Sequence, residues 1–268
     1  MVGAGSAGCV VANRLSEDPT KKVLLLEAGG SESAVSEVPQ AVFILQKTPI
    51  DWQYRTTPQK RCCRGLRDRR INWPRGKLLG GSSALNYMIY IRGSRRDYDR
   101  WANEGAYGWS YDEVLPYFIR SEDNRDLDTA YNGYHGRGGP LTVQRSRWVS
   151  PLAYAFVAAA RMIGYPSIDV NGPDQNGFMI TQSTLRRSSR CSTARAYLYD
   201  YRNRKNLHVV TFAHVTKIIF NNNREAIGVQ FNRFSETHRV YARKDVVISA
   251  GTVNTPQLLM LSGELSDN

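Results

Sequence analysis

A glycine-rich hexapeptide near the start of the chain has the spacing that binds a dinucleotide. It reads Gly3-Ala4-Gly5-Ser6-Ala7-Gly8, and Glu27 follows it nineteen residues later. Glycines allow a tight turn and a close approach of the backbone to a pyrophosphate, which lies at the positive N-terminus of the following helix. An acidic residue at this distance accepts a hydrogen bond from a ribose 2′-hydroxyl and disfavours the 2′-phosphate of NADP. The pattern therefore predicts a dinucleotide site.

The elements around this motif are those that such a site requires. Cys9–Leu15 has the pattern of a helix with a buried face, and Lys22–Glu27 encloses the apolar run of a strand buried on both faces. Only Met1 and Val2 precede the motif, where a strand of about five residues is expected. We therefore expect the recorded chain to begin inside its first strand. A glycine-rich turn in an ordinary α/β protein is the alternative interpretation.

A second glycine-rich stretch occurs at residues 75–83, which read RGKLLGGSS and lead into the largely apolar residues 84–91. Two such turns at strand ends would form one long cleft lined by backbone, which suits an extended dinucleotide. An NAD-dependent Rossmann enzyme has no need of a second cradle, so this stretch argues against that class.

The rest of the chain alternates helical and extended patterns. Helices are predicted at residues 97–102, 111–121, 151–163, 193–199 and 257–261, with caps at Ser110, Ser150, Ser192 and Thr255. Strands are predicted at Leu207–Thr211, Val215–Phe220, Ala226–Phe231, Arg239–Ala242 and Val246–Gly251. Residues 31–57 are expected to form a loop. This order predicts an α/β fold in which a small antiparallel sheet leads back into a parallel one.

Composition excludes several classes of function. The net charge is +12 over 268 residues, but the basic residues are spread along the chain and form no stripe interleaved with aromatics, which argues against nucleic-acid binding. The longest apolar run, Leu152–Ala160, is too short for a transmembrane helix. The cysteines, Cys9, Cys62, Cys63 and Cys191, have neither zinc-ligand spacing nor the density of a disulfide scaffold.

Isolated reactive side chains are interpreted as structural. The histidines, His135, His208, His214 and His238, are expected in structural or surface positions, the last three in or beside the antiparallel strands. The tryptophans, Trp52, Trp73, Trp101, Trp109 and Trp148, are expected in the core or at domain contacts. Cys9 fits a small core residue. No G-x-S-x-G elbow supports a hydrolase, so we expect neither a catalytic residue nor a metal ligand in this chain.

Three separated motifs together resemble the glucose–methanol–choline (GMC) family of FAD-dependent oxidoreductases. They are Gly3–Gly8 with Glu27–Gly30, Gly76–Asn86 with Tyr90, Gly93 and Asp99, and Gly251–Gly263. Gly108–Phe118 and Ser192–Leu198 resemble the animal branch, which includes the insect glucose-dehydrogenase-like members. Animal members often have a cysteine near Ile71 that pairs with one near Cys62 or Cys63; its absence here puts a disulfide in this loop in doubt.

The resemblance implies FAD as the cofactor and assigns residues to its parts. Gly3, Gly5, Ser6, Ala7 and Gly8 would hold the pyrophosphate, Glu27 with Ala28 the ribose, and Gly80, Gly81 and Ser82 the ribityl portion. Asn86, Met88 and Ile89 would lie along the flavin ring, Val215 would meet adenine, and Ala250 and Gly251 would close the site. The implied fold is a truncated Rossmann-like FAD-binding domain with a small antiparallel meander and part of an interleaved substrate domain.

The implied domains are an FAD-binding segment at residues 1–100 with a lid-like loop at about 45–72, the start of a substrate domain at 101–187, and a second FAD-binding segment at 188–268. The implied reaction is oxidation of an alcohol CH–OH group by hydride transfer to flavin. Its catalytic histidine would follow Gly263 in a C-terminal half, because the tail Glu264–Asn268 departs from the family's pattern. The alternative is a truncated remnant without catalysis.

The expected partners are a small-molecule alcohol and an electron acceptor, either oxygen or another compound, with no nucleic acid and no transmembrane segment. The resemblance to the animal branch favours a secreted protein.

Overall fold

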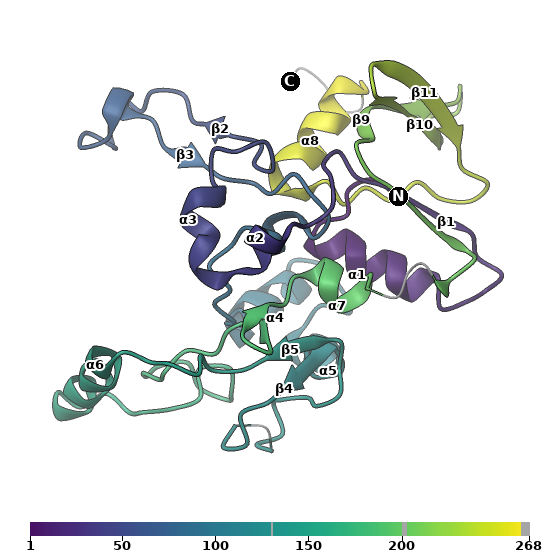
Figure 1. The fold of residues 1–268 in the computed structure, drawn as a ribbon. Coiled ribbons are helices and arrows are strands. Elements are labelled where there is room, and N and C mark those ends of the chain that lie inside the picture. Colours follow the sequence, from purple (N-terminus) through teal and green to yellow (C-terminus); the bar gives the residue numbers. More distant parts are fainter. Residues whose placement is uncertain (130, 200–202, 264–268) are drawn as a thin grey trace. The chain divides into compact units, whose positions relative to one another are not determined.

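The computed structural model describes residues 1–129, 131–199 and 203–263, and they form two compact units (Figure 1). The discontinuous unit combines Met1–Asn86 with the chain from Ser192 onward, and the inserted unit is Tyr87–Cys191. Ile89 bridges Ser183 and the Tyr90 N–H donates to the Gln182 carbonyl, both within the inserted unit. Residues 87–91 thus belong with the inserted unit.

A short parallel sheet organises the discontinuous unit. Helix α1 (Ser6–Leu15) leads to strand β1 (Val23–Leu26), which pairs in parallel with β8 (Leu207–Val210). Val2 extends the sheet by single bridges to Leu26 and Ile248. The predicted helix and strand are therefore confirmed. His208, expected in or beside the antiparallel strands, lies on this parallel strand instead, because β8 pairs with β1.

The core of this sheet forms where α1 packs on it. Ala4, Cys9 and Leu25 are fully buried in one cluster with residues of α7 (Thr193–Tyr197), which Ser192 caps by accepting a hydrogen bond from the Arg195 N–H. Cys9 is thus a core residue, as its position in the sequence predicts. Its thiol donates to the Ala4 carbonyl, inside the glycine turn, so the core directly supports that turn.

An antiparallel meander follows the parallel strands. It consists of β9 (His214–Phe220), β10 (Ala226–Arg233) and β11 (Glu236–Tyr241), in the order β11-β10-β9. Helix α8 (Gly251–Leu261) packs on β9 through a second buried cluster that includes Ile218, Val229 and Leu258. The predicted meander is confirmed.

Two expectations near the end of the chain are wrong. Val246–Gly251 does not form a regular strand, because Ile248 makes only a single bridge, to Val2. Helix α8 begins at Gly251 rather than after Thr255, and it contains Pro256. A proline normally marks a helix start because it lacks the N–H that a helix interior uses. Here the burial of Leu258 against the meander stabilises the helix despite that missing bond.

Short elements fill the segment between β1 and the second glycine-rich stretch. They are α2 (Ala34–Glu37), η1 (Pro39–Ala41), α3 (Val42–Leu45), β2 (Tyr54–Arg55), η2 (Arg67–Arg69), β3 (Asn72–Trp73) and η3 (Gly81–Ala84). The expected loop at residues 31–57 thus contains helical turns, the first of them closed by a capping box between Ser33 and Ser36. Ala41, Leu45 and Leu85 form the small core that fixes them.

The inserted unit is built from helices and short strands. These are α4 (Arg95–Asn103), α5 (Tyr111–Ser121), β4 (Glu122–Asn124), β5 (Leu141–Val143), α6 (Pro151–Met162), β6 (Leu185–Arg186) and β7 (Ser189–Arg190). The helix starts predicted at the caps Ser110 and Ser150 are both confirmed. The Glu113 carboxylate accepts from the Ser110 N–H at 3.0 Å, and the Ser150 hydroxyl accepts from the Leu152 N–H.

Four tryptophans lie at the surface of the described residues. Trp73, Trp101, Trp109 and Trp148 are each at least 45% exposed, so these four are not core residues. Trp101 and Trp109 contact each other edge to face, with ring centroids 6.3 Å apart.

A buried charge network holds the inserted unit together. The His135 imidazole lies between two carboxylates, with Nδ1 2.8 Å from Glu122 and Nε2 2.7 Å from Asp169. Arg92 contacts Glu122 from another side at 2.7 Å. Burial alone would lower the pKa of His135, but the hydrogen bonds to Asp169 and Glu122 outweigh it and raise the pKa to about 9. His135 is therefore an imidazolium that donates from both nitrogens.

We expect His135→Gln to destabilise the protein by about 3–5 kcal/mol, because it removes the cation between Glu122 and Asp169 and leaves Glu122 paired with Arg92 alone. The folded-state pKa exceeds the unfolded value of 6.5, so the stabilisation by His135 is complete below pH 6.5 and is lost as the pH rises through about 9. Melting temperatures measured across this range should fall for the parent protein and vary less for the variant. His238→Gln, at a half-buried position on β11 outside this network, is the control and should keep the parent profile. Equal pH profiles for parent and His135→Gln would contradict the assignment.

Candidate functional site

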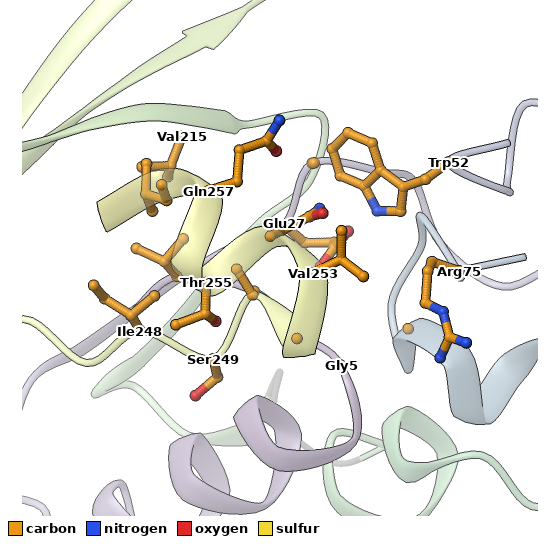
Figure 2. Close-up of a pocket in the computed structure, with 18 of the residues that line it drawn as sticks. Gly5, Glu27, Trp52, Arg75, Val215, Ile248, Ser249, Val253, Thr255 and Gln257 are labelled. Carbon is orange, nitrogen blue, oxygen red and sulfur yellow. The ribbon is translucent and has the colours of Figure 1, made fainter. Parts of the chain in front are cut away.

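A cavity of about 750 Å³ lies within the discontinuous unit. Figure 2 shows side chains from several elements around it: Glu27 follows β1, Trp52 precedes β2, Val215 lies on β9, and Val253 lies on α8. Both glycine-rich stretches border it as well. Segments far apart in the sequence thus converge on one cavity, as the two motifs together predict.

The first glycine turn places the start of α1 at the cavity. Gly5, Ser6 and Ala7 border it, and the first N–H groups of a helix have no acceptor within the helix. Their partial positive charge favours an anion. An added Cβ at Gly5 would meet only the Gly81 Cα, at 3.9 Å, so the space in front of this residue is open.

The other two glycines of this turn are required by packing. Gly3 has a φ of +87°, and a Cβ there would lie 2.5 Å from the Ser249 carbonyl oxygen. A Cβ at Gly8 would lie 1.9 Å from the carbonyl oxygen of Gly3. Gly3 borders the cavity, whereas Gly8 does not. The motif therefore combines one position that leaves room for a ligand with two that let the backbone pack on itself.

The Glu27 carboxylate joins the turn to the end of β1. One oxygen accepts from the Ala4 N–H at 2.8 Å, and the other accepts from the Gly29 N–H at 2.9 Å. The side chain borders the cavity although the residue is only 6% exposed. Burial raises its pKa, opposed by these hydrogen bonds and by the charge of Lys77. Each carboxylate oxygen can accept a second hydrogen bond, so Glu27 can still bind a hydroxyl.

The second glycine turn packs directly on the first. The Gly80 N–H donates to the Ala4 carbonyl at 2.8 Å, and a Cβ on Gly81 would lie 2.7 Å from the Gly5 Cα. Gly81 and Ser82 border the cavity. Gly80 does not; it has a φ of +89° and packs against Ser192 instead.

Most of the predicted cofactor residues are brought together. Eleven border the cavity, namely Gly3, Gly5, Ser6, Ala7, Glu27, Ala28, Gly81, Ser82, Val215, Ala250 and Gly251. Gly8, Gly80 and Asn86 belong to the same unit but do not border it. Met88 and Ile89 lie in the inserted unit, so their place along the flavin ring stays a prediction.

Trp52 is an aromatic wall that the sequence patterns did not single out as a site residue. Its ring contacts His214 edge to face with centroids 5.4 Å apart, and the Lys77 ammonium lies 4.7 Å from the ring centroid. Partial burial lowers the pKa of His214, with a smaller contribution from the charge of Lys77, so this imidazole is neutral near pH 7. Trp52 and His214 both border the cavity.

Arg75 supplies a cation at the second glycine turn. It borders the cavity, and its Nε is buried with no hydrogen-bond partner among the described residues. A buried guanidinium N–H without an acceptor is costly, so the position suits an anionic ligand. In the sequence, only the position of Arg75 next to Gly76, at the start of the second glycine-rich stretch, could have indicated that Arg75 is a site residue.

Other classes of site are not found in the described parts of the chain. Residues 1–129, 131–199 and 203–263 contain no group of three or more side chains arranged to hold a metal ion. Within those residues, no helix has both the length and the apolar character needed to cross a bilayer.

Known proteins resemble this chain over almost its whole length. Glucose dehydrogenase [FAD, quinone] from Drosophila melanogaster is 45% identical over 265 residues, which are 98% of this chain and 42% of that protein. Mitochondrial choline dehydrogenase from Mus musculus is 43% identical over 273 residues, 98% of this chain and 44% of that protein. The chain thus spans about half the length of the curated relatives it matches.

Solved structures agree with the sequence relatives. Pyridoxine 4-oxidase from Mesorbium loti superimposes with a TM-score of 0.89 at 37% identity, covering 98% of this chain and 51% of that one. An FAD-dependent oxidoreductase from Chaetomium thermophilum gives 0.85 at 31% identity, covering 98% and 47%. The family model described as GMC oxidoreductase matches residues 1–266. Fold, cavity and family match agree, and the chain belongs to the GMC oxidoreductase family.

Proposed function

We propose that the protein binds FAD in this cavity and oxidises the CH–OH group of an alcohol. The observation that carries the proposal is the open space in front of Gly5, between two glycine turns that touch through their backbones. Such a cradle admits a group that must approach main-chain N–H donors closely, as a pyrophosphate does. The relatives that are FAD-dependent by name support the choice of FAD.

Charge and shape both fit the cofactor. The start of α1 and the unpartnered Nε of Arg75 provide positive charge for the two phosphates. The acidic Glu27 lies at the end of β1, where a ribose hydroxyl would donate to it. We assign Val215, with the aromatic walls Trp52 and His214, to the adenosine end of the site. Gly81 and Ser82 would border the ribityl portion, and Ala250 and Gly251 would close the site from the opposite side.

Bound FAD would supply the acceptor for the two electrons that the alcohol loses. The residues of this chain bind and orient it, and their N–H donors and buried carboxylate are already fixed by the fold. The base that takes the hydroxyl proton would come from the part of the protein outside this chain. Relatives named for glucose, choline and pyridoxine all support an alcohol substrate, and one of them is named for a quinone acceptor. Secretion, which rests on the resemblance alone, stays a prediction that immunoblotting of culture medium would test.

The direct test uses the full-length protein. It should purify with the visible absorbance of bound flavin, and a panel of alcohols added without oxygen should bleach that absorbance. Readmitted oxygen and an added quinone should then be compared as acceptors. A protein that binds no flavin, or whose flavin no alcohol reduces, would contradict the proposal.

Gly5→Val should remove FAD without unfolding the protein. A Cβ at this position meets the protein only at ordinary contact distance, but the new side chain occupies the place assigned to the pyrophosphate. Overpacking of about 1–3 kcal/mol corresponds to roughly five- to 150-fold weaker binding. Flavin content after gel filtration and the melting temperature would be measured together. Gly65→Val is the control, because a Cβ there meets nothing within 4 Å and Gly65 does not border the cavity. Full flavin occupancy in Gly5→Val would show that this loop is not the cradle.

Glu27→Gln should weaken FAD binding roughly ten- to a hundredfold, since a hydrogen bond to a charged group contributes about 1.5–3 kcal/mol. The amide can accept from only one of the two backbone N–H groups that the carboxylate now binds, so the melting temperature should fall as well. Titration of the apoprotein with FAD gives the affinity. Unchanged affinity in a destabilised protein would limit Glu27 to a structural role.

Arg75→Gln should also weaken FAD binding, by about tenfold or more, through loss of a charge-assisted hydrogen bond. It should reduce the dependence of the affinity on salt concentration, because one phosphate–cation contact disappears. Arg55→Gln, which removes an exposed arginine that is paired with Asp68, is the matched control and should leave both quantities unchanged. The same salt dependence in Arg75→Gln and the parent would contradict a contact with the phosphates.

A further inference from the structure

The tip of the β2–β3 hairpin carries two adjacent cysteines whose sulfur atoms meet. Cys62 Sγ and Cys63 Sγ are 3.4 Å apart, and Cys62 is exposed. Neighbouring side chains of an extended chain point to opposite faces. Cys63 instead has a φ of +60°, a conformation rare for any residue with a side chain. This turn, closed by the hydrogen bond from the Leu66 N–H to the Cys63 carbonyl, brings both thiols to one side.

Basic residues flank this pair in the sequence. Lys60, Arg61, Arg64, Arg67, Arg69 and Arg70 are all exposed, and the single acidic residue of the tip, Asp68, lies 3.7 Å from Arg55. Positive surroundings favour a thiolate, which is the reactive form of cysteine. The hydrogen bond with Cys62 raises the pKa of the Cys63 thiol, so Cys63 holds its proton more tightly than an ordinary thiol does. The tip therefore presents two adjacent cysteine sulfurs in contact, within a strongly basic segment of the chain.

We propose that Cys62 and Cys63 form a redox-active dithiol that hydrogen peroxide oxidises reversibly to a disulfide between adjacent residues. The Cys62 thiolate attacks one peroxide oxygen, the O–O bond breaks, and hydroxide takes a proton to leave as water. The Cys63 sulfur then attacks the resulting sulfenic sulfur, the S–S bond forms, and the sulfenic oxygen leaves as a second water with the Cys63 proton. The two sulfurs lose two electrons together, and the peroxide gains them.

The disulfide would act as a switch rather than as a structural crosslink. Consecutive Cα atoms are 3.80 Å apart across a trans peptide, closer than the 4.4–6.8 Å usual for disulfides. Such a bond is strained, and strained, exposed disulfides are easily reduced. The hairpin that carries the pair begins and ends beside two residues of the cavity, Trp52 and Arg75, and Tyr54 at its base donates a hydrogen bond to Asn254 of α8.

The test uses the full-length protein with and without hydrogen peroxide, followed by thiol alkylation and cleavage after lysine. That cleavage releases residues 61–77, in which Cys62 and Cys63 are the only cysteines. After oxidation, this peptide should be two hydrogens lighter and unalkylated, and dithiothreitol should restore both alkylation sites. The buried Cys9, whose pKa burial raises to about 12, is the internal control and should remain a thiol.

Two sets of variants sharpen the test. Neither Cys62→Ser nor Cys63→Ser should give the lighter peptide. Arg61→Gln with Arg64→Gln should still form it, but roughly threefold more slowly, because fewer positive charges then favour the thiolate form. Two thiols that stay alkylatable, a peptide crosslinked to a different cysteine, or irreversible overoxidation of Cys62 would each overturn the proposal. An unchanged rate in the double arginine variant would overturn the role given to the cations.

Discussion

The two glycine turns touch through main chain alone, with a hydrogen bond from Gly80 to Ala4 and with Gly81 against Gly5. Because no side chain lies between them, the backbone of both turns can border the same cavity. A Cβ at Gly81 would push the two turns apart. A Cβ at Gly3 would clash with the Ser249 carbonyl, and one at Gly8 would clash with the Gly3 carbonyl, so either would displace the first turn. The shape of the site therefore depends on the absence of side chains at these three glycines more than on the presence of any side chain.

The buried carboxylate of Glu27 completes this arrangement. Burying a charge is unfavourable unless hydrogen bonds compensate it, and here two backbone N–H groups from different loops do so. The same bonds hold the first turn against the end of β1. The charge of the site is thus in place before any ligand arrives, which lowers the reorganisation that binding would require.

The sequence predicts best what is local. The glycine spacing, the apolar run of β1 and the capping box at Ser110 each depend on residues within a few positions, and the structure contains all three. Trp52, Arg75 and His214 could not be assigned this way, because only tertiary structure brings β9 and the ends of the hairpin to one cavity. Pro256 is the opposite case: a valid local rule places a helix start there, and packing of α8 on the meander overrides it. Gly80 is required, but for packing against Ser192 rather than for contact with the cavity.

The parallel pairing of β1 with β8 also bears on how the chain is made. Val23 pairs with Leu207, a partner 184 residues later in the chain. At a synthesis rate of about 5–20 residues per second, β1 would leave the ribosome roughly 10–40 seconds before its partner. During that time the inserted unit can form its own core and charge network, whereas β1 keeps an unpaired apolar edge. Strand β1 is therefore among the last elements to complete its pairing, and its exposed apolar edge is open to aggregation until then.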